Sequence, residues 1–244
     1  MIQIKATGNW RRDPGKNHHG FWLLSPNIIY GKAMMIGRNR MEGKFIVLEG
    51  IDKSGKTTLS QSIFSKLVAM NMDVVLTHEP TEHIDEGLGI LNNLDKDEYL
   101  ILTAMFLRDR LWHNRIIEDN LKRKRIVICD RYTLSTMAYQ GVFLKELFHD
   151  TESFYSWMTS TLSLSHIQPD LTIFIDFNSD MFRERFNSSG KLKIFEKADY
   201  LKSVYEIYKE SVRRGLFSKE FLIIPGNSSM EKTLELSFKK IMEL

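Results

Sequence analysis

Hydrophobic residues cluster in five short runs along this chain, separated by longer segments of mixed polarity. The runs are rich in Val, Ile, Phe and Leu, and they cover Phe45–Glu49, Asp73–Thr77, Arg125–Cys129, Leu171–Asp176 and Phe221–Ile224. Short, nearly continuous apolar runs are typical of β-strands that are buried on both faces. The pattern therefore predicts five interior strands.

Between the strands, apolar residues recur with the period of an α-helix. Two such faces are Leu59, Ile63, Leu67 and Met70, and Leu201, Val204, Tyr205, Tyr208 and Val212. Ser228 and Glu231 have the spacing of a capping box that opens a last helix. Alternating strands and helices predict an α/β fold, a five-stranded parallel sheet with helices on both faces and ligands at the carboxyl ends of its strands.

The first 40 residues have no sustained period of either kind. They contain seven Lys or Arg against one acid, Asp13. We expect residues 1–40 to lie outside the fold, as a disordered leader, an organellar transit peptide or the result of a wrongly assigned start codon upstream of Met41. Residues 41–244 would then form one domain. Because the whole chain carries a net charge of only +3, that domain is mildly acidic, and bulk charge gives no reason to expect nucleic-acid binding.

The chain has a single cysteine, Cys129, inside the third apolar run. One cysteine cannot form an internal disulfide, so a reducing cytoplasm is the expected location, with Cys129 a buried core residue. No apolar run approaches the roughly 20 residues that cross a bilayer, and we expect no membrane contact.

Residues 50–57 match the phosphate-binding pattern G-x-x-x-x-G-K-[ST] at every position, between the first strand and a helix. Glycines let the backbone wrap around phosphate, and the helix N-terminus favours anions. Lys56 is expected to reach the β- and γ-phosphates, and the Thr57 hydroxyl to bind Mg²⁺. The predicted ATP-binding residues here are Gly50, Ile51, Asp52, Lys53, Ser54, Gly55, Lys56, Thr57 and Thr58. The motif does not identify the phosphate acceptor, since switches, motors and kinases share it.

Four further segments, taken in order, resemble the thymidylate kinase (dTMP kinase) family, and the resemblance covers roughly residues 43–240. They are the phosphate loop with Glu79-Pro80-Thr81, Met105–Arg110 with His113, Asp130–Gly141, and Asp176 with Arg185 and a lid-like stretch that ends at Phe195-Glu196. The resemblance implies a P-loop kinase fold with a short lid. It also implies transfer of the γ-phosphate of ATP to dTMP, with Mg²⁺ as cofactor, in a homodimer.

The resemblance also assigns acceptor residues. Those expected to bind dTMP are Asp52, Glu79, Pro80, Phe106, Arg110, Arg131, Ser135, Thr136, Tyr139 and Gln140. Phe106 would stack on thymine and Arg110 would hydrogen-bond the base, and the spacing of Phe106, Arg110 and His113 lets one helix face present all three to a single pocket. Arg131 would grip the acceptor phosphate with its planar guanidinium. Asp130 would lie near Mg²⁺ or its waters.

On the donor side, Arg185 matches the arginine that covers adenine. Some family members carry a basic residue in the phosphate loop and others an arginine in the lid. Here the loop has Lys53, whereas the lid stretch has Lys191 and Lys193 but no arginine. We therefore expect Lys53, with Lys56, Asp52 and Arg131, to carry catalysis.

His78 departs from the family pattern, because many members read Arg-Glu-Pro where this chain has His78-Glu79-Pro80.

Three other functions stay open at this point. A deoxynucleoside kinase would need a carboxylate base and typically carries Glu-Arg-Ser where this chain has Asp130-Arg131-Tyr132. A monophosphate kinase with another base preference and a non-catalytic nucleotide sensor are the other two.

Overall fold

A single six-stranded sheet forms the centre of the protein. The computed structural model describes residues 29–31, 43–81, 84, 96–176, 181 and 198–244. The strands are β1 (Ile29–Gly31), β2 (Lys44–Glu49), β3 (Val74–His78), β4 (Ile126–Asp130), β5 (Leu171–Asp176) and β6 (Phe221–Pro225), in the order β1-β3-β4-β2-β5-β6. The five strands β2 to β6 are mutually parallel, which confirms the predicted α/β fold.

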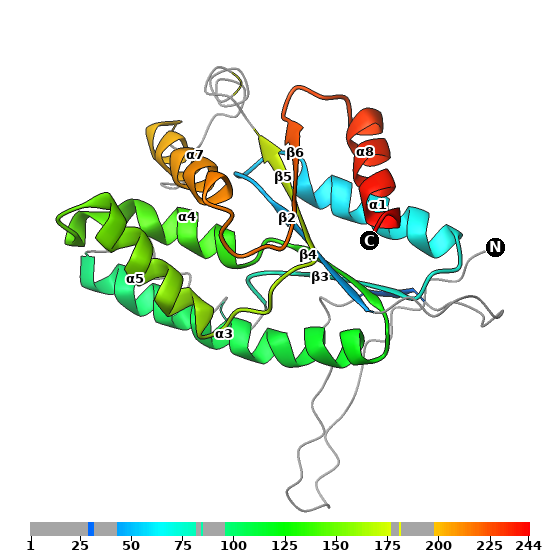
Figure 1. The fold of residues 1–244 in the computed structure, drawn as a ribbon, viewed down its shortest axis with the longest axis horizontal. Helices are drawn as coiled ribbons and strands as arrows, with labels where there is room; N and C mark the ends of the chain where they lie inside the picture. Colours follow the sequence, from blue (N-terminus) through cyan, green and yellow to red (C-terminus); the bar gives the residue numbers. More distant parts are fainter. Residues whose placement is uncertain (1–28, 32–42, 82–83, 85–95, 177–180, 182–197) are drawn as a thin grey trace, which may run out of the picture.

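Helices cover both faces of the sheet. They are α1 (Lys56–Ala69), α3 (Lys96–Lys122), α4 (Thr133–Leu144), the short 3-10 helix η2 (Lys145–Leu147), α5 (Thr151–Ser163), α7 (Ala198–Arg213) and α8 (Met230–Met242). Helices α1 and α8 pack side by side on one face, while α3, α4 and α5 lie on the other, with α7 against α4 (Figure 1). Apolar side chains from both layers meet the strands, whose residues Ile46, Leu48, Ile128 and Ile173 are completely buried.

The β2, β3 and β4 strands lie in register, so that their carboxyl ends meet at one edge of the sheet. Leu48 pairs with Asp130, and His78 pairs with Asp130 from the other side. Side chains that follow these strands therefore come together although they are far apart in the sequence. This edge is the place where the fold positions a site.

The amino-terminal segment departs from the prediction in one respect. Ile29–Gly31 forms β1, an antiparallel edge strand in which Ile29 pairs with Leu76 of β3. These three residues join the sheet instead of lying outside the fold, because β3 would otherwise expose an unpaired edge. The rest of residues 1–40 lies outside the described residues.

The last helix begins one residue later than predicted. Ser229, not Ser228, is its N-cap, and the Ser229 side chain accepts a hydrogen bond from the Lys232 amide. Adjacent serines make both registers plausible in the sequence, and the turn after β6 decides between them. In the preceding helix, Leu201, Val204 and Tyr208 are fully buried as the helical period predicted.

Cys129 is fully buried in β4, and burial raises the pKa of its thiol well above the ordinary value. It is a core residue, as predicted.

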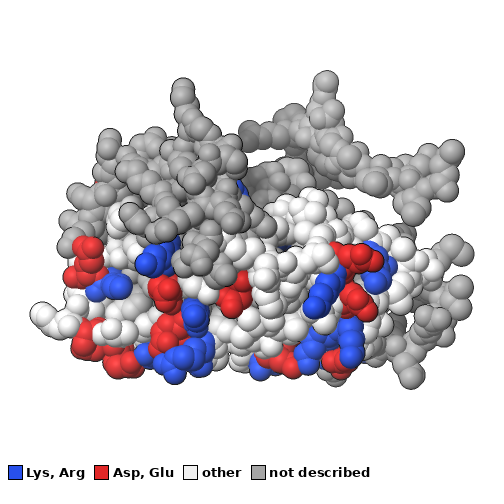
Figure 2. All heavy atoms as spheres, turned by 90° about the horizontal axis from the view of Figure 1, so that it is seen from above, with Lys and Arg blue, Asp and Glu red and all other residues white. Residues whose placement is uncertain are grey.

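Over the described part of the surface in Figure 2, basic side chains are interspersed with acidic ones. Within the described part of the chain, no helix is both long and apolar enough to cross a membrane.

Candidate active site

The phosphate loop joins β2 to α1 through a backbone that ordinary residues adopt rarely. Gly50, Lys53 and Gly55 have φ angles of 144°, 63° and 96°. A Cβ atom on Gly50 would lie 3.0 Å from the Ile175 carbonyl oxygen, so only glycine fits without displacing β5. All nine predicted ATP-binding residues from Gly50 to Thr58 lie in this loop or in the first turn of α1. Arg185 and the lid lysines lie outside the described residues.

Lys56 is buried under this loop. Its Nζ donates to the Ile51 carbonyl oxygen at 2.6 Å and lies 3.3 Å from Ser54 Oγ. Burial, and then the nearby positive charge of Arg131, lower its pKa from 10.5 to about 7. Lysine in such a place favours the arrival of anions, because a phosphate restores the charge that burial disfavours.

Thr57, in the first turn of α1, meets Asp130 at the end of β4. The Thr57 hydroxyl donates to Asp130 Oδ2 at 2.5 Å, while Asp130 Oδ1 is buried and has no hydrogen-bond partner among the described residues. Both residues line a cleft of about 360 Å³ that also contains Gln61 and His78. Within the described ranges no group of three or more His, Cys, Asp or Glu side chains could ligate a metal. Thr57 and Asp130 place one hydroxyl and one carboxylate side by side, which are oxygen groups of the kind that hard cations bind.

Arg131 stands just beyond β4 in a left-handed backbone conformation, with φ of 73°. Its Nη2 donates to Asp52 of the phosphate loop, and Nη1 lies 3.3 Å from Ser135 Oγ. The Asp52 amide donates to the Tyr139 hydroxyl at 2.9 Å. Burial opposes the charge of Arg131, but Tyr139 and Asp52 outweigh burial and raise its pKa well above the ordinary value. A permanent cation thus bridges the phosphate loop and α4.

Glu49 contacts Ser135 and the amide of Tyr132, the residue that follows Arg131, and the sequence analysis did not identify Glu49 as a site residue. It is completely buried, and its Oε1 accepts hydrogen bonds from the amides of Tyr132 at 2.9 Å and Ser135 at 3.2 Å. Its Oε2 accepts from Ser135 Oγ at 2.7 Å and from the Tyr208 hydroxyl at 2.9 Å. Burial raises the pKa of this carboxyl. Glu49 therefore satisfies the open end of α4, where Tyr132 makes no side-chain cap.

A pocket of about 220 Å³ opens beside the phosphate loop, and all ten residues predicted for the acceptor line it. These are Asp52, Glu79, Pro80, Phe106, Arg110, Arg131, Ser135, Thr136, Tyr139 and Gln140. Leu102, Tyr132 and Tyr200 also line it and were missed. Leu102 follows the helical period of α3 that places Phe106, and that signal could have identified it. Tyr200 comes from α7, which no local pattern connects to the pocket.

His113 does not line this pocket, so the expectation that one helix face presents Phe106, Arg110 and His113 to a single pocket was wrong for His113. The His113 imidazole instead contacts Thr77 and Glu79. Arg110 itself is 1% exposed, and its Nε and Nη2 donate to Glu79 Oε2 at 2.9 and 2.8 Å. A buried arginine and a buried carboxylate thus form one wall of the pocket.

A phosphate loop, the Thr57–Asp130 pair and a second pocket lined by Asp52 of that loop and by Arg131 define a P-loop phosphotransferase that acts on a second nucleotide-sized substrate. Residues 48–236 match the family model described as Thymidylate kinase. The chain belongs to the thymidylate kinase family.

Individual relatives agree with the family match. A probable thymidylate kinase of Thermoplasma acidophilum is 34% identical over 199 residues, which are 81% of this chain and 95% of that protein. A probable thymidylate kinase of Methanosarcina mazei is 32% identical and covers 83% of this chain and 97% of its own. A thymidylate kinase of Mycoplasmopsis agalactiae is 32% identical, with 82% of this chain and 94% of that protein covered.

Proposed function

We propose that this protein transfers the γ-phosphate of ATP to dTMP, which yields ADP and dTDP. One observation carries the proposal: the pocket that holds Phe106 and Arg110 is also lined by Asp52 of the phosphate loop and by Arg131, whose guanidinium donates to Asp52. An acceptor held there would have its base near Arg110 and its phosphate near Arg131. Membership of the thymidylate kinase family supports dTMP as that acceptor.

The chemistry follows from alignment and charge. An oxygen of the acceptor phosphate is already anionic at neutral pH, so it attacks the γ-phosphorus without a strong base, and the bond from that phosphorus to the ADP oxygen breaks. Arg131 would hold the acceptor phosphate, and Lys56 would hold the β- and γ-phosphates of ATP. Lys53, at an exposed position of the loop, would reach the phosphoryl group in transfer. Cations held in fixed positions near the charge that develops in the transition state lower the activation barrier for phosphoryl transfer.

Thr57 and Asp130 would hold Mg²⁺, directly or through water. The unpartnered, buried Oδ1 of Asp130 supports this assignment, because an orphaned carboxylate oxygen is costly without a ligand. The ion would neutralise phosphate charge when bound. Asp130 is set in place by β4, whose register with β2 brings it to Thr57.

In the acceptor pocket, Phe106 would stack on the thymine ring, and Thr136 and Gln140 would contact its polar edge. Tyr139 would border the sugar, with its ring fixed by the hydrogen bond from the Asp52 amide. Glu79 and Pro80 would line the same pocket, and Ser135 would support Arg131. A ribose would place its extra hydroxyl against the fixed tyrosine, which favours a deoxyribose.

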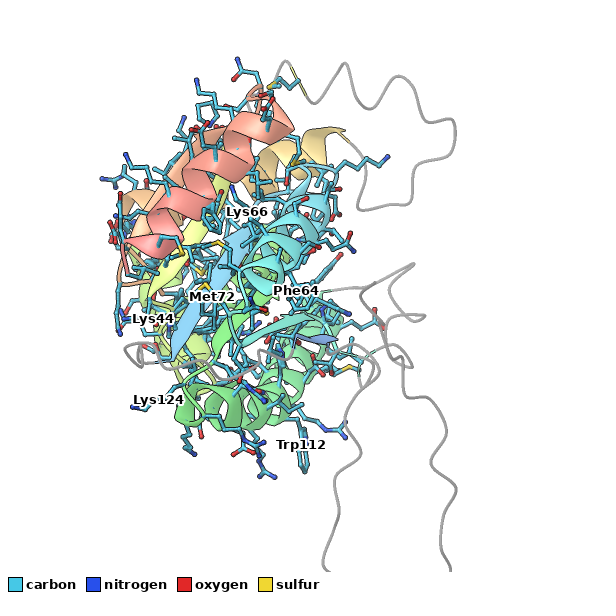
Figure 3. The ribbon with its side chains drawn as sticks, turned by 90° about the vertical axis from the view of Figure 1, so that its right-hand side faces the viewer. Lys44, Phe64, Lys66, Met72, Trp112 and Lys124 are labelled. Atoms are coloured by element: carbon cyan, nitrogen blue, oxygen red, sulfur yellow. The ribbon has the colours of Figure 1, made fainter. Side chains whose placement is uncertain are left out.

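A homodimer through α3 fits the exposed side of this helix. Ile101 and Leu111 are 61% and 51% exposed, and Leu100 is also exposed. Figure 3 shows Trp112 projecting from α3 away from the sheet. Apolar side chains that stand out together on one helix favour burial against a second copy. We place the enzyme in the cytoplasm, where Cys129 stays reduced, and assign it no nucleic-acid partner.

A coupled assay with ATP, Mg²⁺ and a panel of acceptors tests the function. The panel contains dTMP, dUMP, dCMP, AMP and thymidine, and products are identified by chromatography. We expect dTMP to give the highest kcat/KM. Phosphorylation of thymidine would instead support a deoxynucleoside kinase, and preference for AMP or dCMP would replace dTMP with another monophosphate. Binding of ATP without any transfer would indicate a nucleotide sensor.

A further inference from the structure

A buried chain of hydrogen bonds behind Arg110 carries an inference that rests on the proposed function. We propose that His113 is a positioning residue, which acts through Glu79 to hold the guanidinium of Arg110 in the orientation that the acceptor base requires. His113 is 1% exposed and lies three residues beyond Arg110 on α3. Since it does not line the acceptor pocket, it can affect the acceptor only through another residue.

The chain of contacts runs from β3 through α3 to α4. Thr77 Oγ1 lies 2.8 Å from His113 Nε2, and His113 Nδ1 lies 3.0 Å from Glu79 Oε1. Glu79 Oε2 accepts the Nε and Nη2 hydrogens of Arg110, and the same Nη2 donates to Thr136 Oγ1 at 2.7 Å. All five residues are 5% exposed or less. Such a dry network has few alternative arrangements.

Charge fixes the direction of each hydrogen bond. Burial would raise the pKa of Glu79, but Arg110 and then His113 outweigh it and the pKa is lowered, so the carboxylate stays ionised and can only accept. His113 Nδ1 must therefore donate to Glu79. In the neutral imidazole, Nε2 is then an acceptor for the Thr77 hydroxyl. Glu79 thus sets which ring nitrogen of His113 carries the donated proton, Thr77 holds the opposite side of the ring, and the ring fixes one oxygen of Glu79.

With both oxygens of Glu79 engaged, Arg110 has little freedom left. A guanidinium is planar, so two anchored nitrogens define where the third lies. That third nitrogen, Nη1, is buried and has no hydrogen-bond partner in the described part of the chain. Arg110 also lines the acceptor pocket. A buried donor without a partner points to an acceptor atom that arrives with the ligand.

This arrangement would select the base by chemistry. Arginine can only donate, so it can hydrogen-bond to a carbonyl oxygen of thymine or uracil but not to an exocyclic amino group such as that of cytosine. Selection of this kind requires a fixed donor, because a mobile side chain would move away from the wrong base. His113 supplies that rigidity without touching the nucleotide.

The test compares three variants with the wild-type protein, using steady-state kinetics with dTMP, dCMP and ATP. His113→Leu removes the donor to Glu79, and we expect it to raise the KM for dTMP by about ten- to a hundredfold, the range for a hydrogen bond to a charged group. The preference for dTMP over dCMP should fall as well, while the KM for ATP stays unchanged. His113→Asn keeps an N–H near Nδ1 and should recover most of the loss.

Thr77→Val is the milder variant, of similar shape, and it decides the matter if His113→Leu does not fold. It removes only the hydroxyl that contacts the imidazole, so we expect an increase of about threefold in the KM for dTMP.

Asn120→Leu is the control on α3, the helix that carries His113. Asn120 is 4% exposed and hydrogen-bonds Ile116 and Arg125, away from the network. It should lower stability without changing the KM for dTMP.

A double-mutant cycle separates positioning from a general effect on the fold. If His113 acts through Arg110, His113→Leu should change dTMP affinity by less than about twofold in an Arg110→Met background. The same loss in both backgrounds, or a wild-type KM for dTMP in His113→Leu and Thr77→Val, would overturn the inference. If the wild-type protein does not prefer dTMP in the acceptor panel, the proposed function itself is wrong. The panel assay uses no variants, so it distinguishes this outcome from a failure of the inference about His113.

Discussion

His166 gives a pH dependence of stability that can be worked out from its surroundings. The residue lies before β5, with Nδ1 3.0 Å from Thr133 Oγ1 and its ring centroid 5.0 Å from that of Phe217. Its Nε2 is buried and has no hydrogen-bond partner among the described residues. Burial, and then the positive charge of Arg110, lower the pKa from 6.5 to about 4, although Glu79 acts in the opposite direction.

The sign follows from proton linkage. Between pH 6.5 and pH 4 the unfolded chain binds a proton at His166 and the folded protein does not, so acid stabilises the unfolded state. The free energy of unfolding therefore falls as pH falls through this window. The full pKa difference corresponds to about 3 kcal/mol, and at about pH 5 the loss is about 2 kcal/mol. These are upper values, because the ring keeps some contact with solvent.

Urea denaturation of the wild-type protein and His166→Asn at a series of pH values measures this effect. Asparagine does not titrate and its amide can still contact Thr133. Between about pH 8 and pH 5 we expect the wild-type protein to lose about 2 kcal/mol more than the variant. Comparing slopes removes any constant loss from the substitution. His149→Asn, at an exposed position, is the matched control for replacing a histidine by asparagine. Parallel curves for the wild-type protein and His166→Asn would refute the reasoning.

Three further predictions concern the loop and the leader. Lys53→Ala should lower kcat by about 10²-fold or more in the coupled assay, and a near-wild-type kcat would remove Lys53 from the mechanism. Gly50→Ala should abolish ATP binding in calorimetry, because its Cβ would contact the Ile175 carbonyl oxygen at 3.0 Å in a backbone conformation with φ of 144°; wild-type affinity would show that the loop adapts. Deleting residues 1–40 removes β1 but none of the described residues that line either pocket, so kcat should stay unchanged while thermal unfolding shifts to lower temperature; lost activity would show that the leader belongs to the enzyme.

The interior strands and the phosphate loop could be predicted because their signals are local. A run such as Ile126–Val127–Ile128 is a strand by its own composition, and the structure moves its boundaries by only one residue. The glycine-rich loop carries its own backbone requirement. The ten acceptor residues came from the family resemblance, and the structure brings all of them to one pocket.

What could not be predicted depends on contacts between distant residues. Ile29–Gly31 is only three residues long, too short for a period to be recognised, and it pairs with the edge of β3. Glu49 looks like the polar end of a strand, yet Tyr208 and Ser135 reach it from two helices. The period of α3 places His113 near Arg110, but only the tertiary structure shows that Glu79 lies between them.

The register of the sheet is itself part of the site. Arg131 adopts a backbone conformation that costs on the order of 1–3 kcal/mol, and such strain persists only where surrounding contacts hold it. Here the Arg131 amide donates to the Leu48 carbonyl oxygen at 3.0 Å, and the Cys129 thiol donates to the Arg131 carbonyl oxygen at 2.9 Å. Glu49, the residue after Leu48, holds the start of α4 directly beyond the strained arginine. The end of β2 therefore positions the phosphate loop that follows it and also the arginine that follows β4. A one-residue slip between these strands would reverse their faces and separate the two pockets, so the core that fixes the register also fixes the distance over which phosphate is transferred.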